Sequence, residues 1–135
     1  MRAMLNWAYL NTLPEVENRF GVKLNDDEKV VFAEKLSLLG DHKGQMLGSE
    51  SPFTMTNQRI IVDNGAGIWT VELEKEATDF VRVDYGKWIF KGTYFALPLN
   101  KEVVFDDGKR SLTGYQFYFG KELIPKMTAI VEALK

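Results

Sequence analysis

Residues 53–65 read FTMTNQRIIVDNG, and the rest of the chain can be organised around this stretch. Its first extended run stops at the polar pair Thr56-Asn57, whose short side chains favour a tight bend by bonding the local backbone. The run resumes as Ile60-Ile61-Val62 and ends in Asn64-Gly65, a dipeptide that accepts positive φ and is typical of hairpins. The stretch therefore predicts β-structure on both sides of a bend, followed by a hairpin into the next strand.

The chain after this stretch is predicted to be mainly β. Trp69, Val71 and Leu73 alternate with polar residues, which is the period of a half-buried strand. Gly86-Lys87 predicts a turn, and the segment Asp106-Asp107-Gly108-Lys109-Arg110 predicts a second hairpin. The predicted strands on this side are residues 69–74, 80–85, 88–97, 103–105 and 112–119. The strand over residues 88–97 is expected to end at Pro98.

The spacing of apolar residues changes from strand to helix after Gly120. Pro125 suits the first turn of a helix, where its missing N–H costs little. The apolar positions at helical spacing are Leu123, Met127, Ile130, Val131 and Leu134. The chain is therefore expected to end in an amphipathic helix.

The N-terminal residues predict two short helices, over residues 3–11 and 13–20. The apolar residues of 29–39 fit the period of a helix or of a strand, and the segment is predicted as the first strand because the chain after it is β. Met4, Leu5 and Ala8 would form the apolar side of the first helix, so packing against the body is expected. The alternative is a partner-binding surface at Trp7 and Tyr9.

The order of short strands followed by one amphipathic helix resembles the pleckstrin-homology-like (PH-like) fold, and Thr56, Asn57 and Arg59 resemble the T-N-x-R motif of GRAM and bacterial PH-like domains. The resemblance covers residues 28–135 and leaves residues 1–27 as an N-terminal helical extension. It implies a mainly β, α+β fold: a barrel of about seven antiparallel strands with a C-terminal capping helix. From the residues alone, Arg59 is expected to pair with an acid or a carbonyl and to lay its stem on the barrel.

The composition excludes several kinds of chemistry. The chain has no cysteine, which excludes disulfides, thiolate metal sites and cysteine nucleophiles and fits a reducing cytoplasm. Its single histidine, His42, does not predict a catalytic triad or a histidine-rich metal site. No catalytic residue, cofactor site or metal site is predicted, and the protein is not expected to be an enzyme. No apolar run approaches the length of a membrane-spanning helix, and the N-terminus does not resemble a signal peptide.

The net charge of −2 argues against nucleic acid as a partner, but the charge is unevenly distributed. Residues 1–79 hold eight basic and thirteen acidic residues, whereas residues 80–135 hold nine and six. Solvated strand ends explain this distribution, and the alternative is a basic surface on the later strands. The residues expected on such a surface are Lys87, Lys91, Lys101, Lys109 and Arg110.

The sequence therefore predicts a cytoplasmic binding module that contacts a protein partner, or a second copy of itself, through an open sheet edge or the N-terminal helices. One alternative is peripheral association with anionic lipids through the basic surface and Trp7. A second is small-molecule binding in a cavity lined by aromatic residues, although such residues more often fill the core. These aromatic residues are Trp69, Trp88, Phe90, Tyr94, Tyr115 and Phe117; no substrate is indicated.

Overall fold

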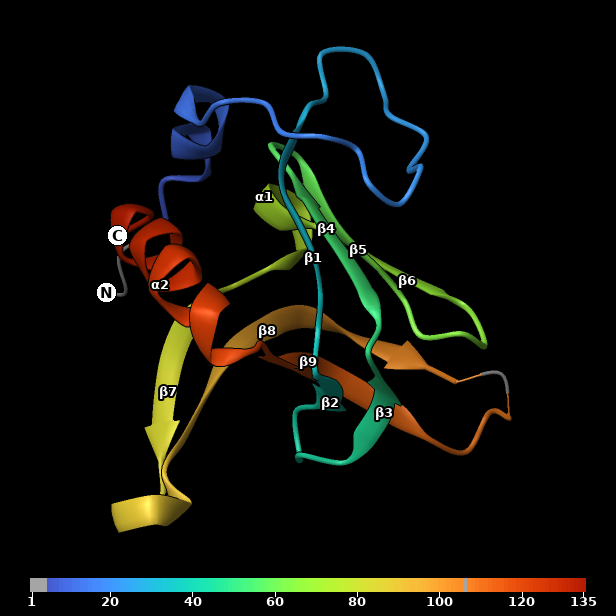
Figure 1. The fold of residues 1–135 in the computed structure, drawn as a ribbon. Coiled ribbons are helices and arrows are strands. Elements are labelled where there is room, and N and C mark those ends of the chain that lie inside the picture. Colours follow the sequence, from blue (N-terminus) through green and yellow to red (C-terminus); the bar gives the residue numbers. More distant parts are fainter. Residues whose placement is uncertain (1–4, 106) are drawn as a thin grey trace.

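The computed structural model describes residues 5–105 and 107–135, and within them nine strands form two antiparallel sheets (Figure 1). One sheet has the order β1 (Val30–Lys35), β4 (Pro52–Thr56), β5 (Arg59–Asp63), β6 (Ile68–Glu72). The other has the order β3 (Met46–Ser49), β2 (Leu38–Asp41), β9 (Ser111–Tyr118), β8 (Gly92–Val104), β7 (Val81–Tyr85). The helices are α1 (Leu73–Glu76) and α2 (Ile124–Ala133), and the 3₁₀ turns are η1 (Trp7–Thr12), η2 (Trp88–Phe90) and η3 (Lys121–Leu123).

The predicted fold class is confirmed, with two differences. The sheets do not close into a barrel, because β6 lies at the edge of one sheet and β3 and β7 at the edges of the other. Residues 29–39 form strand rather than helix, as predicted, but they form two strands instead of one. The first part belongs to the four-stranded sheet and the second part to the five-stranded sheet. Leu36 N–H donates to Ser51 O, whereas Ser37 N–H donates to Tyr118 O of the other sheet, so the chain divides into β1 and β2.

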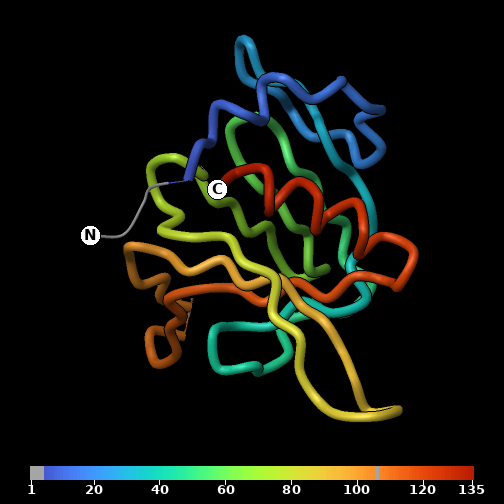
Figure 2. The backbone as a smooth tube through the Cα atoms, turned by 90° about the vertical axis from the view of Figure 1, so that its left-hand side faces the viewer, coloured from blue at the N-terminus to red at the C-terminus, as the bar shows by residue number. Residues whose placement is uncertain are grey.

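The core is filled by aromatic rings from both sheets. Phe53 is fully buried and lies edge-on to Phe32, Phe117 and Phe119, at centroid distances of 5.9, 5.1 and 5.2 Å. Such edge-to-face pairs add to the stabilisation from area burial. Helix α2 lies across the opening between the sheets (Figure 2), and its buried residues are Met127, Ile130, Val131 and Leu134 at its end. The amphipathic C-terminal helix is thus confirmed.

Both predicted hairpins are confirmed by side chains that bond the turn backbone. Asn64 Oδ1 accepts from the N–H groups of Ala66 and Gly67 at 3.0 and 2.9 Å. Asp107 Oδ1 accepts from the N–H groups of Lys109 and Arg110 at 2.8 and 3.1 Å. Asp106, which was also assigned to this turn, lies outside the described residues.

The two predicted N-terminal helices are wrong. The first is the 3₁₀ turn η1, which buries Trp7 and Leu10 and leaves Ala8 exposed; Met4 lies outside the described residues. Residues 13–20 contain no helix. Leu13 is extended, with φ −74° and ψ 145°, because the residue before a proline is disfavoured in the helical region.

The strand predicted over residues 88–97 is also wrong at both ends. Trp88–Phe90 form the turn η2 instead, and β8 starts only at Gly92. Its C-terminal end is not Pro98, because the strand continues to Val104 and absorbs the proline at an irregularity of the ladder between Pro98 and Val103.

Candidate functional site

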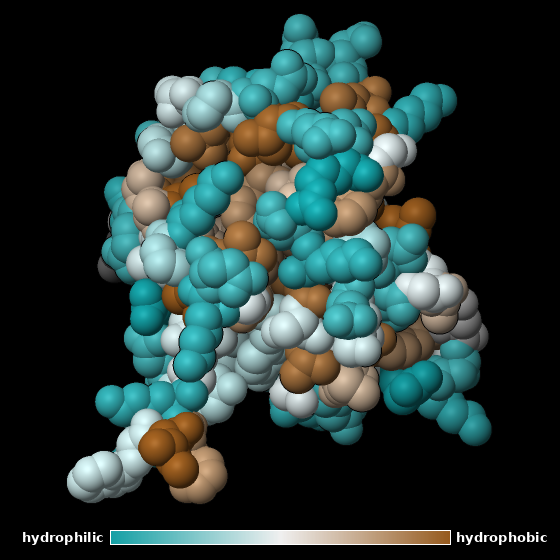
Figure 3. Space-filling view, in the orientation of Figure 1, coloured by the Kyte–Doolittle hydropathy of each residue, from teal (hydrophilic) through white to brown (hydrophobic). Residues whose placement is uncertain are grey.

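The hairpin of β7 and β8 extends away from the body of the molecule (Figures 1 and 2). Three exposed apolar residues lie at its end. Trp88, Ile89 and Phe90 have exposed fractions of 85%, 89% and 78%. We call these three residues the apolar tip. Lys87 and Lys91 flank it and are exposed as well. Figure 3 shows the end of the hairpin projecting as a group of white to brown side chains.

The backbone of the hairpin holds the tip in an unusual conformation. Gly86 has φ +80°, and a Cβ there would lie 2.1 Å from Phe90 O, so the turn requires glycine. Trp88 itself has φ 62°, a left-handed conformation that costs of order 1–3 kcal/mol in a residue other than glycine. The packing of the tip does not repay this strain, because the Trp88 side chain is exposed. A strained, exposed aromatic residue at the end of a hairpin makes this position a candidate for function.

Three tyrosine rings support the base of the hairpin. Tyr94 lies 5.9 Å from Tyr85 and 5.3 Å from Tyr118, measured between ring centroids. Tyr85 pairs across the ladder with Gly92, where a Cβ would lie 2.2 Å from the tyrosine hydroxyl. The glycine therefore leaves the space that the Tyr85 ring occupies, and the rings brace the two strands against the sheet.

A groove with a volume of about 550 Å³ lies between the base of the hairpin and the start of α2. Arg82, Lys91 and Lys121 line it, and no acidic residue is among its lining residues. Arg82 donates to Asp84 and, through one guanidinium nitrogen, to Thr128 Oγ1 at 3.0 Å. Within the described residues, Lys91 and Lys121 form no ion pair or hydrogen bond through their side chains. This groove, which we call the basic groove, therefore presents unpaired positive charge near the apolar tip.

Two pKa shifts describe the base of the hairpin. Hydrogen bonds from Thr93 and Arg82 lower the pKa of the exposed Asp84 carboxyl, which keeps it ionised beside the arginine. Burial, followed by the neighbouring Tyr85 and Tyr94, raises the pKa of the Tyr118 hydroxyl. The Tyr118 hydroxyl is therefore a neutral group, and Lys91 and Lys121 carry the unpaired charge of the basic groove.

The T-N-x-R residues have a different role, because they tie the bend between β4 and β5 to the N-terminal segment. Thr56 Oγ1 donates to Glu28 Oε2 at 2.6 Å and accepts from Arg59 N–H at 2.9 Å. Arg59 Nε donates to the same Glu28 oxygen at 2.8 Å, and its terminal nitrogen donates to Lys23 O at 2.6 Å. The expectation that Arg59 pairs with an acid or a carbonyl is confirmed with both kinds of partner.

Burial alone would raise the pKa of Glu28, whose side chain is fully buried. Hydrogen bonds from Arg59, Thr56 and the backbone N–H of Asn25 outweigh the burial and hold this pKa below its ordinary value. The buried carboxylate is thus ionised and fully engaged in structure.

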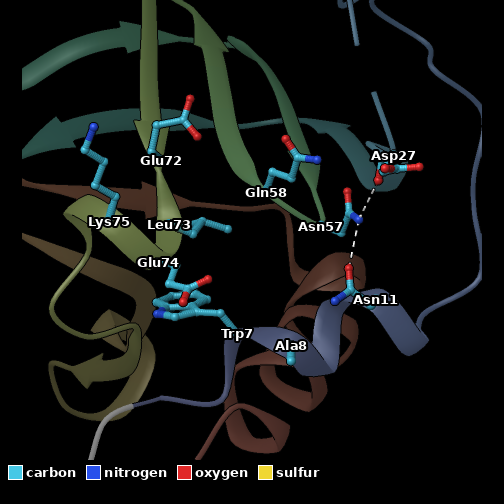
Figure 4. A pocket seen from close by; sticks show the side chains of 10 residues that line it. All are labelled: Trp7, Ala8, Asn11, Asp27, Asn57, Gln58, Glu72, Leu73, Glu74 and Lys75. Atoms are coloured by element: carbon cyan, nitrogen blue, oxygen red, sulfur yellow. Dashed lines mark hydrogen bonds between the residues drawn. The ribbon is translucent and has the colours of Figure 1, made fainter. Parts of the chain in front are cut away.

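A depression of about 610 Å³ adjoins the motif, and its lining includes the carboxylates of Asp27, Glu72 and Glu74 (Figure 4). Asn57 reaches into it and donates to Asn11 Oδ1 at 2.8 Å and to Asp27 O at 3.1 Å. The acidic side chains disfavour an anionic ligand here. The Asn57 side chain is thus bonded within the chain, which supports a structural role for the motif.

Replacing Asn57 with alanine is expected to lower the free energy of unfolding by about 1–3 kcal/mol. The substitution removes both donations and leaves Lys29 N–H, which donates to Asn57 Oδ1 at 2.9 Å, without its acceptor. Chemical denaturation measures the loss. Gln58→Ala is the matched control, because the Gln58 side chain makes only exposed bonds of 3.2 and 3.4 Å, and we expect the variant to change stability by less than about 0.5 kcal/mol. Equal effects of the two variants would contradict the role of Asn57.

The residues proposed from sequence as a binding surface lie in four separate places. Lys87 and Lys91 flank the apolar tip, whereas Lys109 and Arg110 lie in the turn between β8 and β9, at the other end of β8. Lys101 pairs with Glu76. Trp7 is only 8% exposed and belongs to the core, and Tyr9 is half-buried against it. The prediction thus included the lysines of the tip but missed the apolar residues between them.

The aromatic residues expected around a small-molecule cavity do not line a common cavity. Trp88 and Phe90 are at the apolar tip, Tyr115 and Phe117 are in the core, and Tyr94 is at the hairpin base. Among residues 5–105 and 107–135 no group of three or more potential metal ligands occurs. The same part of the chain contains no helix long and apolar enough to cross a membrane.

One solved structure, the Vps36 N-terminal PH domain, is similar to this chain over 90% of both chains, with a TM-score of 0.57 and 19% sequence identity. The likeness shows a PH-like fold, the class to which the two sheets and the C-terminal helix belong. Neither the protein-family models nor the curated proteins yielded a match. The finer resemblance to GRAM and bacterial PH-like domains remains a prediction.

Proposed function

We propose that this protein is a peripheral membrane-binding module that inserts its apolar tip into the interface of an anionic bilayer. The observation that carries the proposal is the sequence Lys87-Trp88-Ile89-Phe90-Lys91 at the end of a projecting hairpin, with all three apolar side chains at least 78% exposed. Tryptophan and phenylalanine suit the boundary between headgroups and acyl chains, and flanking lysines suit anionic headgroups.

The energies of this arrangement are sufficient for reversible binding. Burying one large apolar side chain contributes about 1.5–3 kcal/mol, and each lysine near an anionic surface contributes about 1 kcal/mol. The tip offers three apolar side chains, and Lys87, Lys91 and Lys121 lie on or close to the same hairpin. The basic groove would then lie at the level of the headgroup phosphates while the tip enters the bilayer.

The shape of the site favours a bilayer over a protein surface. A stable protein interface buries about 800 Å² on each partner, which calls for a broad complementary surface. The tip is instead a narrow projection of three residues, and exposed lysines border it on both sides. Such a projection can enter a fluid interface without a matching pocket.

Replacing Trp88 with glycine is expected to separate membrane binding from folding. Glycine adopts φ 62° without strain, so the melting temperature is expected to stay constant or rise. Loss of the indole is expected to weaken binding to phosphatidylserine-containing vesicles by about 2 kcal/mol, or roughly thirtyfold. Vesicle co-sedimentation and thermal unfolding measure the two effects.

The matched control is Lys109→Gly in the turn at the opposite end of β8, which we expect to leave vesicle binding unchanged. If Trp88→Gly keeps full vesicle affinity, the tip does not insert. If a soluble protein partner occupies the tip instead, Trp88→Gly will lose that partner, and neither the wild type nor Trp88→Gly will bind vesicles.

The expectation of a protein partner or of self-association stays open on separate grounds. The N-terminal surface suggested for it is largely used within the chain, since Trp7 and Leu10 pack into the core. The open sheet edge is still available, because β6 has a neighbour on one side only. A cytoplasmic location and the absence of enzymatic activity also remain predictions.

A further inference from the structure

We infer that a second site, at the open corner between β6 and the C-terminal end of β8, binds an extended, uncharged apolar peptide of a partner protein by strand addition to β6. This corner holds a groove of about 640 Å³, which we call the corner groove. Three of its apolar lining residues are exposed: Met46 by 69%, Ile68 by 69% and Val104 by 57%. Its volume lies in the range of ligand-binding pockets, and isolated apolar side chains do not usually gather in this way.

Aromatic rings form part of the floor of the corner groove. Trp69 lies edge-on to Phe105 and Tyr115, at centroid distances of 5.3 and 5.9 Å. The Arg110 guanidinium lies 4.8 Å from the centre of the Phe105 ring and is also paired with Asp107 at 2.9 Å. The two charges in the wall therefore compensate each other, and the groove favours neutral apolar side chains.

The backbone beside the groove offers unpaired hydrogen-bonding groups. At the two ends of the ladder between β5 and β6, Asn64 N–H donates to Gly67 O and Leu73 N–H donates to Gln58 O. In an antiparallel ladder hydrogen-bonded pairs alternate with pairs that are not bonded, so these two bonds show which residues of β6 bond to β5. Ladder bonds to β5 consequently fall on Trp69 and Val71, so the N–H and C=O groups of Ile68 and Thr70 point to the open edge. An edge of this kind can pair with an extended peptide.

Two further features limit how a peptide would bind. At the far end of β6 the N–H of Glu72 is already taken by Glu76 Oε1 at 2.8 Å, so pairing is confined to the stretch around Ile68–Thr70. Across the groove β8 also has a free side, because its residues 103 and 104 pair only with β9. A helix cannot use these backbone groups, since its own N–H and C=O groups are bonded internally.

The corner groove is independent of the apolar tip. The tip precedes Gly92, the first residue of β8, whereas the groove adjoins Val104, the last of its 13 residues. At about 3.3 Å per residue the strand spans at most roughly 40 Å, and the irregularity between Pro98 and Val103 shortens it, but the two sites still lie at its opposite ends. A peptide could therefore bind at the groove while the tip is in a bilayer, and this inference does not rest on the membrane proposal.

The test is selection of displayed random dodecapeptides on the full chain, followed by fluorescence anisotropy with the synthesised winners. We expect peptides with apolar residues at alternate positions. Thr70→Pro removes the outward N–H without touching a bond to β5, and is expected to weaken binding at least tenfold. Thr70→Val, which keeps the N–H, is the matched control and is expected to bind normally. Ile68→Asp is a second variant on an exposed side chain and is expected to have the same effect as Thr70→Pro.

A variant in which Trp88, Ile89 and Phe90 are all replaced with serine is expected to bind the peptides with unchanged affinity. This variant separates the inference from the membrane proposal. Failure to enrich any peptide overturns the inference, as do enriched peptides whose affinity neither Thr70→Pro nor Ile68→Asp changes. Sedimentation equilibrium identifies the other occupant: a dimer that Thr70→Pro dissociates would mean that a second copy of this chain, not a partner peptide, fills the groove.

Discussion

Replacing Trp88, Ile89 and Phe90 together with serine is expected to abolish vesicle binding and to leave the fold intact. The three side chains contribute almost nothing to the core, since each is at least 78% exposed. In a bilayer interface they would account for most of the apolar contact, so we expect affinity for phosphatidylserine-containing vesicles to fall roughly a hundredfold or more. Vesicle flotation measures binding, and the circular dichroism melting curve measures stability.

The control for this variant is Lys87→Gln with Lys91→Gln, which removes charge and keeps the apolar tip. This control is expected to weaken binding to anionic vesicles at low salt and to make the remaining binding less sensitive to salt than that of the wild type, because the two lysines act through a screened surface potential and Lys121 still contributes. Vesicle binding by the triple serine variant at the original affinity would refute the assignment of the tip.

The second large effect is expected at Arg59. Changing it to methionine leaves the carboxylate of Glu28 buried with Thr56 and one backbone N–H as its remaining partners. Removing one partner of a buried pair typically costs about 3–5 kcal/mol, so the variant is expected to be unfolded or close to it at physiological temperature. Urea denaturation measures the loss. Arg19→Met is the matched control, because the side chains of Arg19 and of its ion-pair partner Glu34 are 43% and 35% exposed, so that solvent screens the pair.

The same pair predicts how stability depends on pH. The pKa of Glu28 is lower in the folded than in the unfolded state, because Arg59 and Thr56 bond its ionised form more strongly than burial disfavours it. Its contribution is therefore present above the unfolded pKa and is lost as the pH falls through the folded pKa. The wild type is expected to lose stability in this acidic range, and Glu28→Gln, which has no carboxyl to titrate, is expected to lose less there.

Sequence patterns were most informative where local chemistry decides the structure. The Asn64-Gly65 turn, the bend at Thr56-Asn57 and the helix after Gly120 follow from side chains that act on their own neighbouring backbone. Glu28 was not recognised as the partner of Arg59, because the two are distant in sequence and only the fold brings them together. Tertiary contacts, not local propensity, determine this pair.

The apolar tip was misread for a different reason. Trp88, Ile89 and Phe90 have high strand propensity, which reports packing on a half-buried surface rather than a backbone preference. The signal that could have corrected the reading is the symmetry of the segment 86–92, GKWIFKG, which places a glycine and a lysine on each side of the apolar residues. Positive φ at Gly86 reverses the chain before a strand can form.

The most direct test of membrane insertion uses the absence of cysteine in the chain. A single nitroxide label is attached at Ile89→Cys in one sample and at Lys109→Cys in another, and electron paramagnetic resonance measures accessibility to oxygen and to a water-soluble nickel complex with bound vesicles. The proposal predicts that the label at position 89 becomes accessible to oxygen and shielded from nickel, while the label at position 109 stays aqueous. A vesicle-bound protein with both labels in water would contradict insertion of the tip.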